Sequence, residues 1–243
     1  MLLQSRCAGC DRPGVPLCRT CRFALVHPAR PPVVAAPATG RARSGAGADA
    51  TDRIIAAVPF TGRARDVVLG FKYRNRRQLA AHLAGLLVNR LLADGVRPGV
   101  DIDVVTWAPT SAGRRRQRGF DQAELIARQV ALQLGLRSRR LLERGHDAPT
   151  QTGLGRVDRL KGPTFGARPD VAGRRVLVLD DVVTTGATLR SAGATLRDAG
   201  AHGVVLAAVA STPGGVASRR QRWGQVVTGP WADSGTAPTR RTA

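Results

Sequence analysis

Two neighbouring carboxylates and a hydroxyl-rich turn mark the stretch VLVLDDVVTTGATL at residues 176–189. Asp180 and Asp181 follow four apolar residues, and three threonines surround Gly186. Hydroxyl groups and the free N–H groups at the start of a helix bind phosphate well, and glycine lets the backbone close around an anion. Because the two acids would repel a bare phosphate, we expect them to meet sugar hydroxyls or a metal ion beside it.

A strand and a helix must position these groups. The apolar run at residues 176–179 predicts a strand covered on both faces of a parallel sheet, with the acids at its carboxyl end. From Leu189 to Ala199 apolar residues recur at spacings of three and four, which predicts a helix that ends near Gly200. Such units bind ligands in the crevice beyond the strand ends. An ATPase metal site is excluded, because neither lysine of the chain lies in the glycine-rich loop that it requires.

The segment resembles the phosphoribosyl pyrophosphate (PRPP) motif of type I phosphoribosyltransferases. The resemblance implies that Asp180 and Asp181 are catalytic residues that hold the ribose hydroxyls. It also implies that a loop holds the 5′-phosphate and that Mg²⁺ binds together with PRPP. The residues of this loop are Thr184, Thr185, Gly186, Ala187 and Thr188.

A second strand, loop and helix occur earlier in the chain. Residues 103–107 predict a buried strand, and apolar residues from Ala123 to Leu134 predict a helix. The order of segments resembles the ComF family, which pairs a cysteine-rich amino terminus with a phosphoribosyltransferase-like domain and carries an R-G-F-[ND]-Q motif, here residues 118–122. The resemblance covers most of residues 1–212.

The loop between this strand and helix is the expected pyrophosphate site, as the resemblance implies. The residues placed there are Thr110, Ser111, Arg114 and Arg118, and Arg118 joins the two acids as a catalytic residue. Arginine suits the task because its planar fork can bind two phosphate oxygens at once. The neighbouring Arg115 and Arg116 are expected in a solvated basic loop.

A connection at residues 144–165 is rich in Gly, Pro and Thr and is longer than most loops. ComF-like sequences carry a Q-x-x-L-x-x-x-x-R pattern here, matched by Gln151, Leu154 and Arg159. The resemblance implies a mobile lid over the substrate. Lys161-Gly162-Pro163 stands where the family has an Asn, so the end of this lid differs from the family pattern.

All four cysteines lie near the amino terminus. Cys7, Cys10, Cys18 and Cys21 form two C-x-x-C pairs, the pattern of a tetrahedral zinc site with four thiolate ligands. Two disulfides are the alternative, but residues 1–6 do not resemble a secretory signal, and the cytosol keeps thiols reduced. We therefore predict one structural zinc ion and a cytoplasmic protein.

The 243 residues, of which 43% are hydrophobic, fit one domain with appendages. We predict an α/β fold with a mainly parallel central sheet flanked by helices and a small amino-terminal zinc-binding module. The predicted parts are a zinc knuckle at residues 1–29, a flexible linker at 30–52, a phosphoribosyltransferase-like domain at 53–212 and a disordered basic tail at 213–243. No stretch approaches the roughly 20 apolar residues of a membrane span.

The predicted domain begins with a strand at residues 54–60 and helices at 63–70 and 78–92, the latter with a leucine-rich face. The resemblance implies that these elements form a hood over the site. Lys72 is expected between the two helices. There it either reaches the pyrophosphate or is a solvated loop lysine.

Positive charge is the last feature that bears on function. The formal net charge is +21, and each end, residues 1–52 and 213–243, carries +4, which leaves +13 on the predicted domain. Such an excess attracts polyanions, nucleic acid above all. The scarcity of lysine beside abundant Arg, Ala and Gly fits a compositionally biased genome equally well.

Two functions stay open from the sequence. The first is an enzyme that transfers the phosphoribosyl group of PRPP to an acceptor and releases pyrophosphate. The second is a non-catalytic protein that senses PRPP, or that binds single-stranded DNA together with competence or recombination proteins. ComF proteins are associated with natural competence and DNA uptake, so the resemblance supports both. The sequence does not identify the acceptor.

Overall fold

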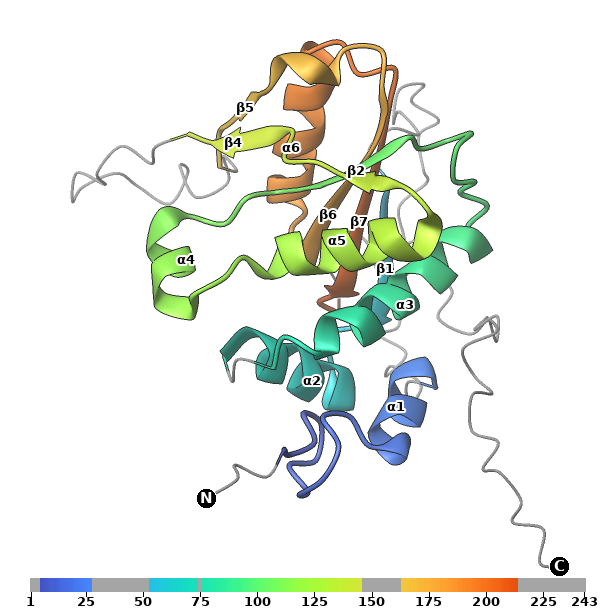
Figure 1. The fold of residues 1–243 in the computed structure, drawn as a ribbon, viewed down its shortest axis with the longest axis vertical. Coiled ribbons are helices and arrows are strands. Elements are labelled where there is room, and N and C mark those ends of the chain that lie inside the picture. Colours follow the sequence, from blue (N-terminus) through green and yellow to red (C-terminus); the bar gives the residue numbers. More distant parts are fainter. Residues whose placement is uncertain (1–4, 28–52, 74–75, 146–162, 214–243) are drawn as a thin grey trace, which may run out of the picture.

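The computed structural model describes residues 5–27, 53–73, 76–145 and 163–213. Five strands of these segments form one sheet in the order β1-β7-β6-β2-β3 (Figure 1), and each neighbouring pair is parallel. The predicted α/β fold with a mainly parallel sheet is thereby confirmed. The strands are β1 (Ile54–Pro59), β2 (Val104–Trp107), β3 (Arg137–Ser138), β6 (Arg175–Val183) and β7 (Gly203–Ser211).

Strand β6 lies in the interior of the sheet. Residues 176–179 are fully buried, as predicted for a parallel strand covered on both faces. The strand is longer than predicted, since it continues through Asp180 and Asp181 to Val183. The reason is that β7 pairs with β6 as far as Val183, whereas β2 pairs with it only as far as Leu179. The two acids thus belong to the strand itself.

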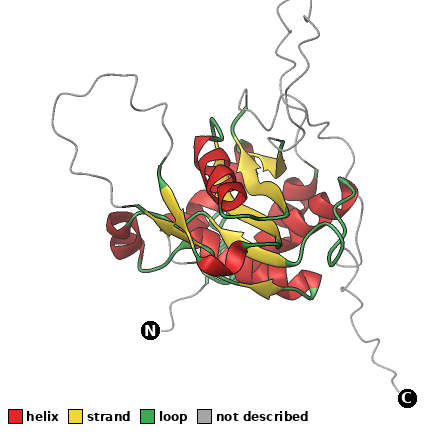
Figure 2. Ribbon diagram, turned by 90° about the horizontal axis from the view of Figure 1, so that it is seen from above, coloured by secondary structure: helices red, strands yellow, loops and turns green. Residues whose placement is uncertain are grey.

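Helices cover both faces of the sheet (Figure 2). On β6, Leu177 and Leu179 pack into the core beneath α3 and α5, whereas Val176 and Val178 pack into the core beneath α6. This alternation is the period of two expected of a strand between two layers. The principal helices are α2 (Gly62–Tyr73), α3 (Leu79–Ala93), α5 (Gln122–Leu134) and α6 (Ala187–Asp198).

The predicted helices exist, with two changes at their ends. Helix α6 begins at Ala187, before the first apolar residue of its periodic face. Helix α2 continues to Tyr73, because the fully buried Phe71 extends its apolar face by another turn. Lys72 therefore lies in the last turn of α2 rather than in a loop between helices.

The basic segment after β2 is a short helix, α4 (Ala112–Arg118), where a loop was predicted. The Ser111 hydroxyl accepts a hydrogen bond from the N–H of Arg114 at 3.4 Å, and Gly119 ends the helix with φ of 74°. These caps provide hydrogen-bond partners for backbone groups at the two helix ends, which would otherwise bond only to solvent. No residue of α4 is buried, so Arg115 and Arg116 are solvated as predicted.

The remaining described elements lie at the amino terminus and at the base of the predicted lid. They are helix α1 (Arg19–Val26), the antiparallel strands β4 (Leu142–Arg144) and β5 (Phe165–Ala167), and a 3₁₀ turn (Pro169–Val171). The predicted lid residues, including Gln151 and Arg159, the predicted linker and nearly all of the predicted tail lie outside the described residues. Among the helices that are described, none is long and apolar enough to span a bilayer.

The junction between β2 and α5 depends on one buried carboxylate. Asp121 accepts hydrogen bonds from the N–H groups of Ala123 at 3.1 Å and Glu124 at 3.4 Å, which caps α5. Its other oxygen accepts from the N–H of Thr110 at 2.9 Å.

Asp121→Ala leaves these three N–H groups without their acceptor. We expect it to lower the free energy of unfolding in urea by about 1–3 kcal/mol. Asp121→Asn, which also caps helices, should cause a smaller loss. Equal losses in the two variants would contradict this account of the junction.

Candidate functional site

The candidate site lies where β2 and β6 part. The two strands pair up to Trp107 and Leu179, and the N–H of Ala108 still donates to the carbonyl oxygen of Leu179 at 2.9 Å. Beyond this point the chain after β2 leads to α5 on one face of the sheet, and the chain after β6 leads to α6 on the other (Figure 1). Parallel sheets bind ligands at such a point, in the crevice beyond the strand ends.

The acid pair, Asp180 and Asp181, lies on the β6 side of this crevice. Asp181 Oδ1 is 2.9 Å from Lys72 Nζ, and the two side chains are only 13% and 15% exposed. Asp180 Oδ1 accepts a hydrogen bond from the N–H of Asp181 at 2.7 Å. Burial, followed by the neighbouring Asp181 carboxylate, raises the pKa of Asp180 to about 8. One acid is thus paired with a cation, while the other binds its proton more tightly than an ordinary Asp.

The threonine loop, residues 184–188, joins the acid pair to α6. Gly186 is buried with φ of 79°, and a Cβ atom there would stand 2.6 Å from Ile54 Cδ1. Only glycine therefore fits without strain. Thr184 and Thr185 are exposed, and Gly186 opens α6 without a side-chain cap. The loop presents hydroxyls beside the start of a helix, which is the arrangement that favours phosphate.

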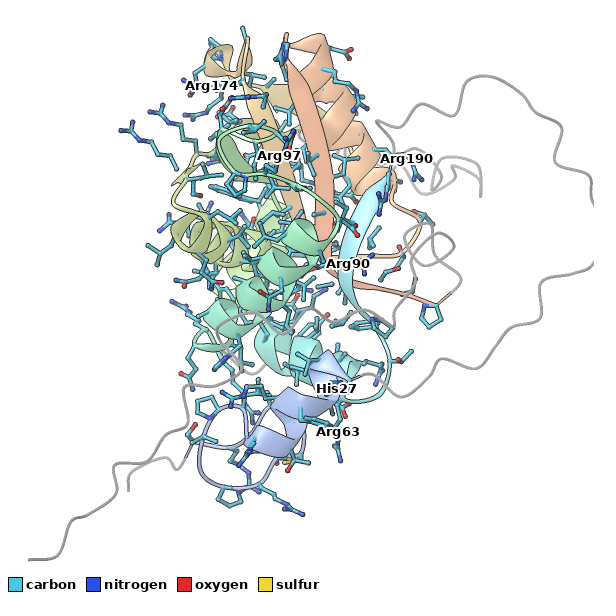
Figure 3. All side chains as sticks on the ribbon, turned by 90° about the vertical axis from the view of Figure 1, so that its right-hand side faces the viewer. His27, Arg63, Arg90, Arg97, Arg174 and Arg190 are labelled. Carbon is cyan, nitrogen blue, oxygen red and sulfur yellow. The ribbon has the colours of Figure 1, made fainter. Side chains whose placement is uncertain are left out.

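Arg190 is a residue of this loop region that the sequence analysis missed. Its Nη2 donates to the carbonyl oxygen of Thr185, and its guanidinium packs against Gly186 beside the start of β1 (Figure 3). The contact occupies an oxygen that would repel an anion and adds a positive charge near the loop. The available signal was its spacing, because residues four apart on a helix are neighbours.

Thr110 and Ser111 leave β2 on the opposite side of the crevice. The Asp121 bond fixes the Thr110 backbone, and Ser111 caps α4. Because β2 and β6 are neighbouring strands that pair as far as Trp107 and Leu179, this loop and the acid pair begin side by side at the same edge of the sheet. The structure therefore brings the two predicted halves of the site together.

Arg114 and Arg118 differ in their surroundings. Arg114 is exposed on α4. Arg118 points to α2 and α5, since its guanidinium donates to Gln122 Oε1 and to the Tyr73 hydroxyl, both at 3.1 Å, and lies 4.9 Å above the Tyr73 ring. Its Nε is buried and has no acceptor within the described part of the chain.

The base of the predicted lid is attached to both sides of the crevice. Arg144 of β4 donates to the carbonyl oxygen of Pro109 at 3.4 Å. The hydroxyl of Ser191 in α6 donates to the carbonyl oxygen of Pro163 at 2.7 Å. The described ends of the lid segment thus contact the loop after β2 and the helix that follows the threonine loop.

The cysteine cluster, formed by Cys7, Cys10, Cys18 and Cys21, is a second candidate site. Its four Sγ atoms all lie within 4.8 Å of one another, and no disulfide joins them. Thiolates about 2.3 Å from a zinc ion form a tetrahedron with sulfurs roughly 3.8 Å apart. The Cys10 and Cys18 Sγ atoms are 3.7 Å apart, so the cluster fits one zinc ion.

Local hydrogen bonds prepare the cluster for metal binding. The N–H of Cys18, the residue that precedes α1, donates to Cys7 Sγ at 3.3 Å. Burial by itself would raise the pKa of Cys7, but the N–H groups of Cys18, Cys10 and Gly9 lower it to about 6. Since thiolates rather than thiols bind metals, the hydrogen bonds to Cys7 favour coordination. Burial raises the pKa of Cys21, so a metal ion would have to displace the proton of that thiol.

Comparisons with known proteins bear on the crevice. Residues 118–233 match the family model of the phosphoribosyl transferase domain. The match includes β6, the threonine loop and α6, but not the cysteine cluster. A search of the curated proteins found no match to the chain.

Similar solved structures include the glutamine PRPP amidotransferase of B. subtilis, with 23% identity and a TM-score of 0.38 over 58% of this chain and 30% of that chain. An adenine phosphoribosyltransferase has 17% identity and a TM-score of 0.38 over 63% and 79% of the two chains. The enzyme of that name from Saccharomyces cerevisiae has 19% identity and a TM-score of 0.35 over 58% and 71%. The chain spans 25% and 30% of the first two structures that it resembles. The assignment of the domain rests on the family match.

Zinc content tests the cysteine cluster. Elemental analysis of the purified protein should find about one zinc ion per chain. Cys10→Ser removes a ligand and should release the metal and lower the stability of the amino terminus, whereas Thr20→Ser, at an exposed neighbour, should do neither. A fully folded protein without metal, or two disulfides in mass spectrometry, would count against a zinc site.

The raised pKa of Asp180 makes stability depend on pH. An ordinary Asp has a pKa of about 3.9, so between pH 4 and pH 8, roughly, the folded protein binds this proton more tightly than the unfolded chain. The contribution of Asp180 to the free energy of unfolding therefore decreases as the pH rises through this range. The thermal midpoint of Asp180→Asn should exceed that of the wild type by more at pH 8 than at pH 5. The exposed Asp198→Asn is the control, and an unchanged difference for Asp180→Asn would contradict the assignment.

Proposed function

We propose that this chain is a phosphoribosyltransferase-like protein of the ComF type. In this proposal its domain at residues 53–212 binds PRPP with Mg²⁺ and transfers the phosphoribosyl group, a glycosyl transfer that releases pyrophosphate. One observation carries the proposal. The acid pair at the end of β6 continues directly into a glycine-opened threonine loop at the start of α6, beside the crevice between β2 and β6.

The proposal is supported by the arrangement of the candidate groups, since the acid pair leads into the threonine loop and the loop after β2 begins beside it. The ligand has a 5′-phosphate at one end, two ribose hydroxyls in the middle and a pyrophosphate at the other end. We assign the 5′-phosphate to the threonine loop, with Arg190 behind it. The acid pair receives the hydroxyls. The pyrophosphate is assigned to Thr110, Ser111, Arg114 and Arg118.

Arg118 Nε gives this last assignment physical support. A buried donor without an acceptor costs free energy, and such groups are rare in folded proteins. Arg118 Nε is such a donor among the described residues, and a pyrophosphate oxygen would satisfy it. The other two guanidinium nitrogens already bind Gln122 and Tyr73, which fixes the direction of Nε.

The reaction breaks the bond between ribose C1 and the pyrophosphate oxygen and forms a bond from C1 to the acceptor. Positive charge develops on the ribose and negative charge on the leaving group. Fixed donors near the pyrophosphate would therefore supply much of the acceleration. Mg²⁺, when bound with PRPP, would neutralise part of the pyrophosphate charge. Lys72 would hold Asp181 in place beneath the ribose, since the two are already paired.

Ligand-induced stabilisation tests the site. PRPP with Mg²⁺ should raise the thermal midpoint, because a ligand that binds only the folded state stabilises it. Asp181→Asn should reduce this shift by weakening the ribose contacts. Gly186→Val should abolish it, because the side chain would strike Ile54 at a backbone geometry that favours glycine.

Gly85→Ala is the matched glycine control, since a Cβ there meets no atom closer than 3.5 Å. It should keep the full shift. Calorimetry that detects no binding of PRPP to the wild type would overturn the proposal. Release of pyrophosphate from PRPP, measured across a panel of bases with and without DNA, would separate a transferase from a non-catalytic PRPP sensor.

Binding of single-stranded DNA, together with competence or recombination proteins, is a second candidate function, and α4 favours it. Arg114, Arg115 and Arg116 are exposed in this helix, which contains no acidic residue. No side-chain partner holds them within the described part of the chain. Unpaired arginines on an exposed helix can neutralise phosphates and release their counterions.

Salt dependence tests this second function. The affinity for single-stranded DNA should fall as salt rises, with each neutralised phosphate adding about 0.7 to the log-log slope. Replacing Arg115 and Arg116 by Ala should lower the slope and leave PRPP binding intact. The matched control replaces Arg19 and Arg22 of α1, which removes the same charge elsewhere. If no DNA binding were detected near physiological salt, or if the salt slope were unchanged in the variant, genome composition would be the better explanation of the positive charge.

A further inference from the structure

A single helix, α2, lies between the cysteine cluster and the crevice. We propose that the metal-bound cluster is a positioning element of the phosphoribosyl site: it fixes α2, and α2 holds Lys72 on Asp181. This inference rests on the proposed function, and it gives the cluster a role in ligand binding beyond local stability.

Close packing joins the cluster to one side of α2. A Cβ atom on Gly70 would stand 3.1 Å from Ala8 Cβ, and a Cβ atom on Gly9 would stand 3.2 Å from Val67 Cγ2 and 2.8 Å from Cys21 Sγ. Two glycines thus allow the first C-x-x-C turn to approach α2 closely. Cys7 and Cys21 are buried in the same core as Val67, so the position of α2 depends on the position of the cluster.

Arginines fasten the same contact at both ends of α2. Arg63, in its first turn, donates to the carbonyl oxygen of Gly9 at 2.6 Å, and it lies near α1 in Figure 3. Arg76, just beyond its last turn, pairs with Asp11 at 3.1 Å and is only 13% exposed. The Arg63 bond reaches the first C-x-x-C turn, and the Arg76 bond reaches the residue that follows this turn. Loss of the metal would release that turn, because metal binding and folding of such small modules are coupled.

The other side of α2 contacts the site. Lys72 follows Gly70 by two residues, so the two point about 200° apart around the helix axis. Lys72 Nζ reaches Asp181 at 2.9 Å, and the carbonyl oxygen of Lys72 accepts a hydrogen bond from Gln122 at 3.4 Å. The next residue, Tyr73, binds Arg118. A displacement of α2 therefore moves groups from both halves of the crevice.

The coupling has a thermodynamic form that can be measured. If zinc favours the position of α2 that PRPP needs, zinc strengthens PRPP binding, and PRPP must strengthen zinc binding by the same factor. A shift of about 1 Å in a positioning group is enough to weaken a bound geometry substantially. If α2 transmits the effect of zinc on PRPP binding, this effect also requires the Lys72 side chain.

The experiment measures PRPP binding to the full chain by calorimetry, with zinc and after removal of zinc by a chelator. We expect removal of zinc to weaken PRPP binding at least about fivefold. Lys72→Met should weaken it also, and removal of zinc from that variant should cause little further loss. In the wild type, PRPP should slow the transfer of zinc to the chelator, a readout that needs no activity.

Arg63→Ala provides a test in the zinc-loaded, folded protein. It breaks the bond to Gly9 without changing a cysteine or the crevice, and we expect it to weaken PRPP binding in the same direction. Arg65→Ala, an exposed arginine of the same helix, is the matched control. This inference alone would be overturned if neither removal of zinc nor Arg63→Ala changed the affinity for PRPP. It would also be overturned if removal of zinc weakened PRPP binding as much in Lys72→Met as in the wild type. Absence of PRPP binding in every state would overturn the proposed function with it.

Discussion

The parallel pairing of β6 with two strands of unequal reach determines the geometry of the site. Its partner β7 pairs as far as Val183, whereas β2 stops at Leu179. The backbone of the acid pair is therefore held on one side by β7 and open on the side where β2 has departed. If strands paired with the acid pair on both sides, a ligand would have no space there. If no strand paired with it, the backbone of the two acids would not be fixed. Unequal pairing thus gives two acidic residues a place near the end of a largely apolar strand.

The sequence alone predicted those parts of the fold that depend on local patterns. Apolar spacing identified the strand at 176–179 and the helix around α5, and the two C-x-x-C pairs indicated a cluster whose thiols do come together. It did not predict that β6 extends through Asp181, because that extension depends on pairing with a strand later in the chain. It also did not predict α4, which has no apolar period and is stabilised by its caps. The pairing of Lys72 with Asp181 joins residues far apart in the sequence, so no local pattern could reveal it.

The R-G-F-D-Q segment at residues 118–122 has a structural role at nearly every position. Gly119 ends α4, and Phe120 packs against Phe71 with ring centroids 5.9 Å apart. Asp121 caps α5 and holds the loop after β2, and the buried Gln122 binds both Arg118 and the end of α2. Four of its five residues thus form the junction of α4 and α5 with the end of α2. Its arginine also carries a buried Nε that has no acceptor among the described residues.

Helix α4 contributes nothing to the core, since none of its residues is buried and its two ends are held by Ser111 and Gly119. Its outward side chains can therefore be exchanged with little effect on folding, provided that the caps remain. Selection could change the charge of this exposed helix independently of the acid pair and the threonine loop. In protein engineering, Arg115 and Arg116 are accordingly the positions at which the surface charge can be altered while Arg114, Arg118 and the two caps are left unchanged.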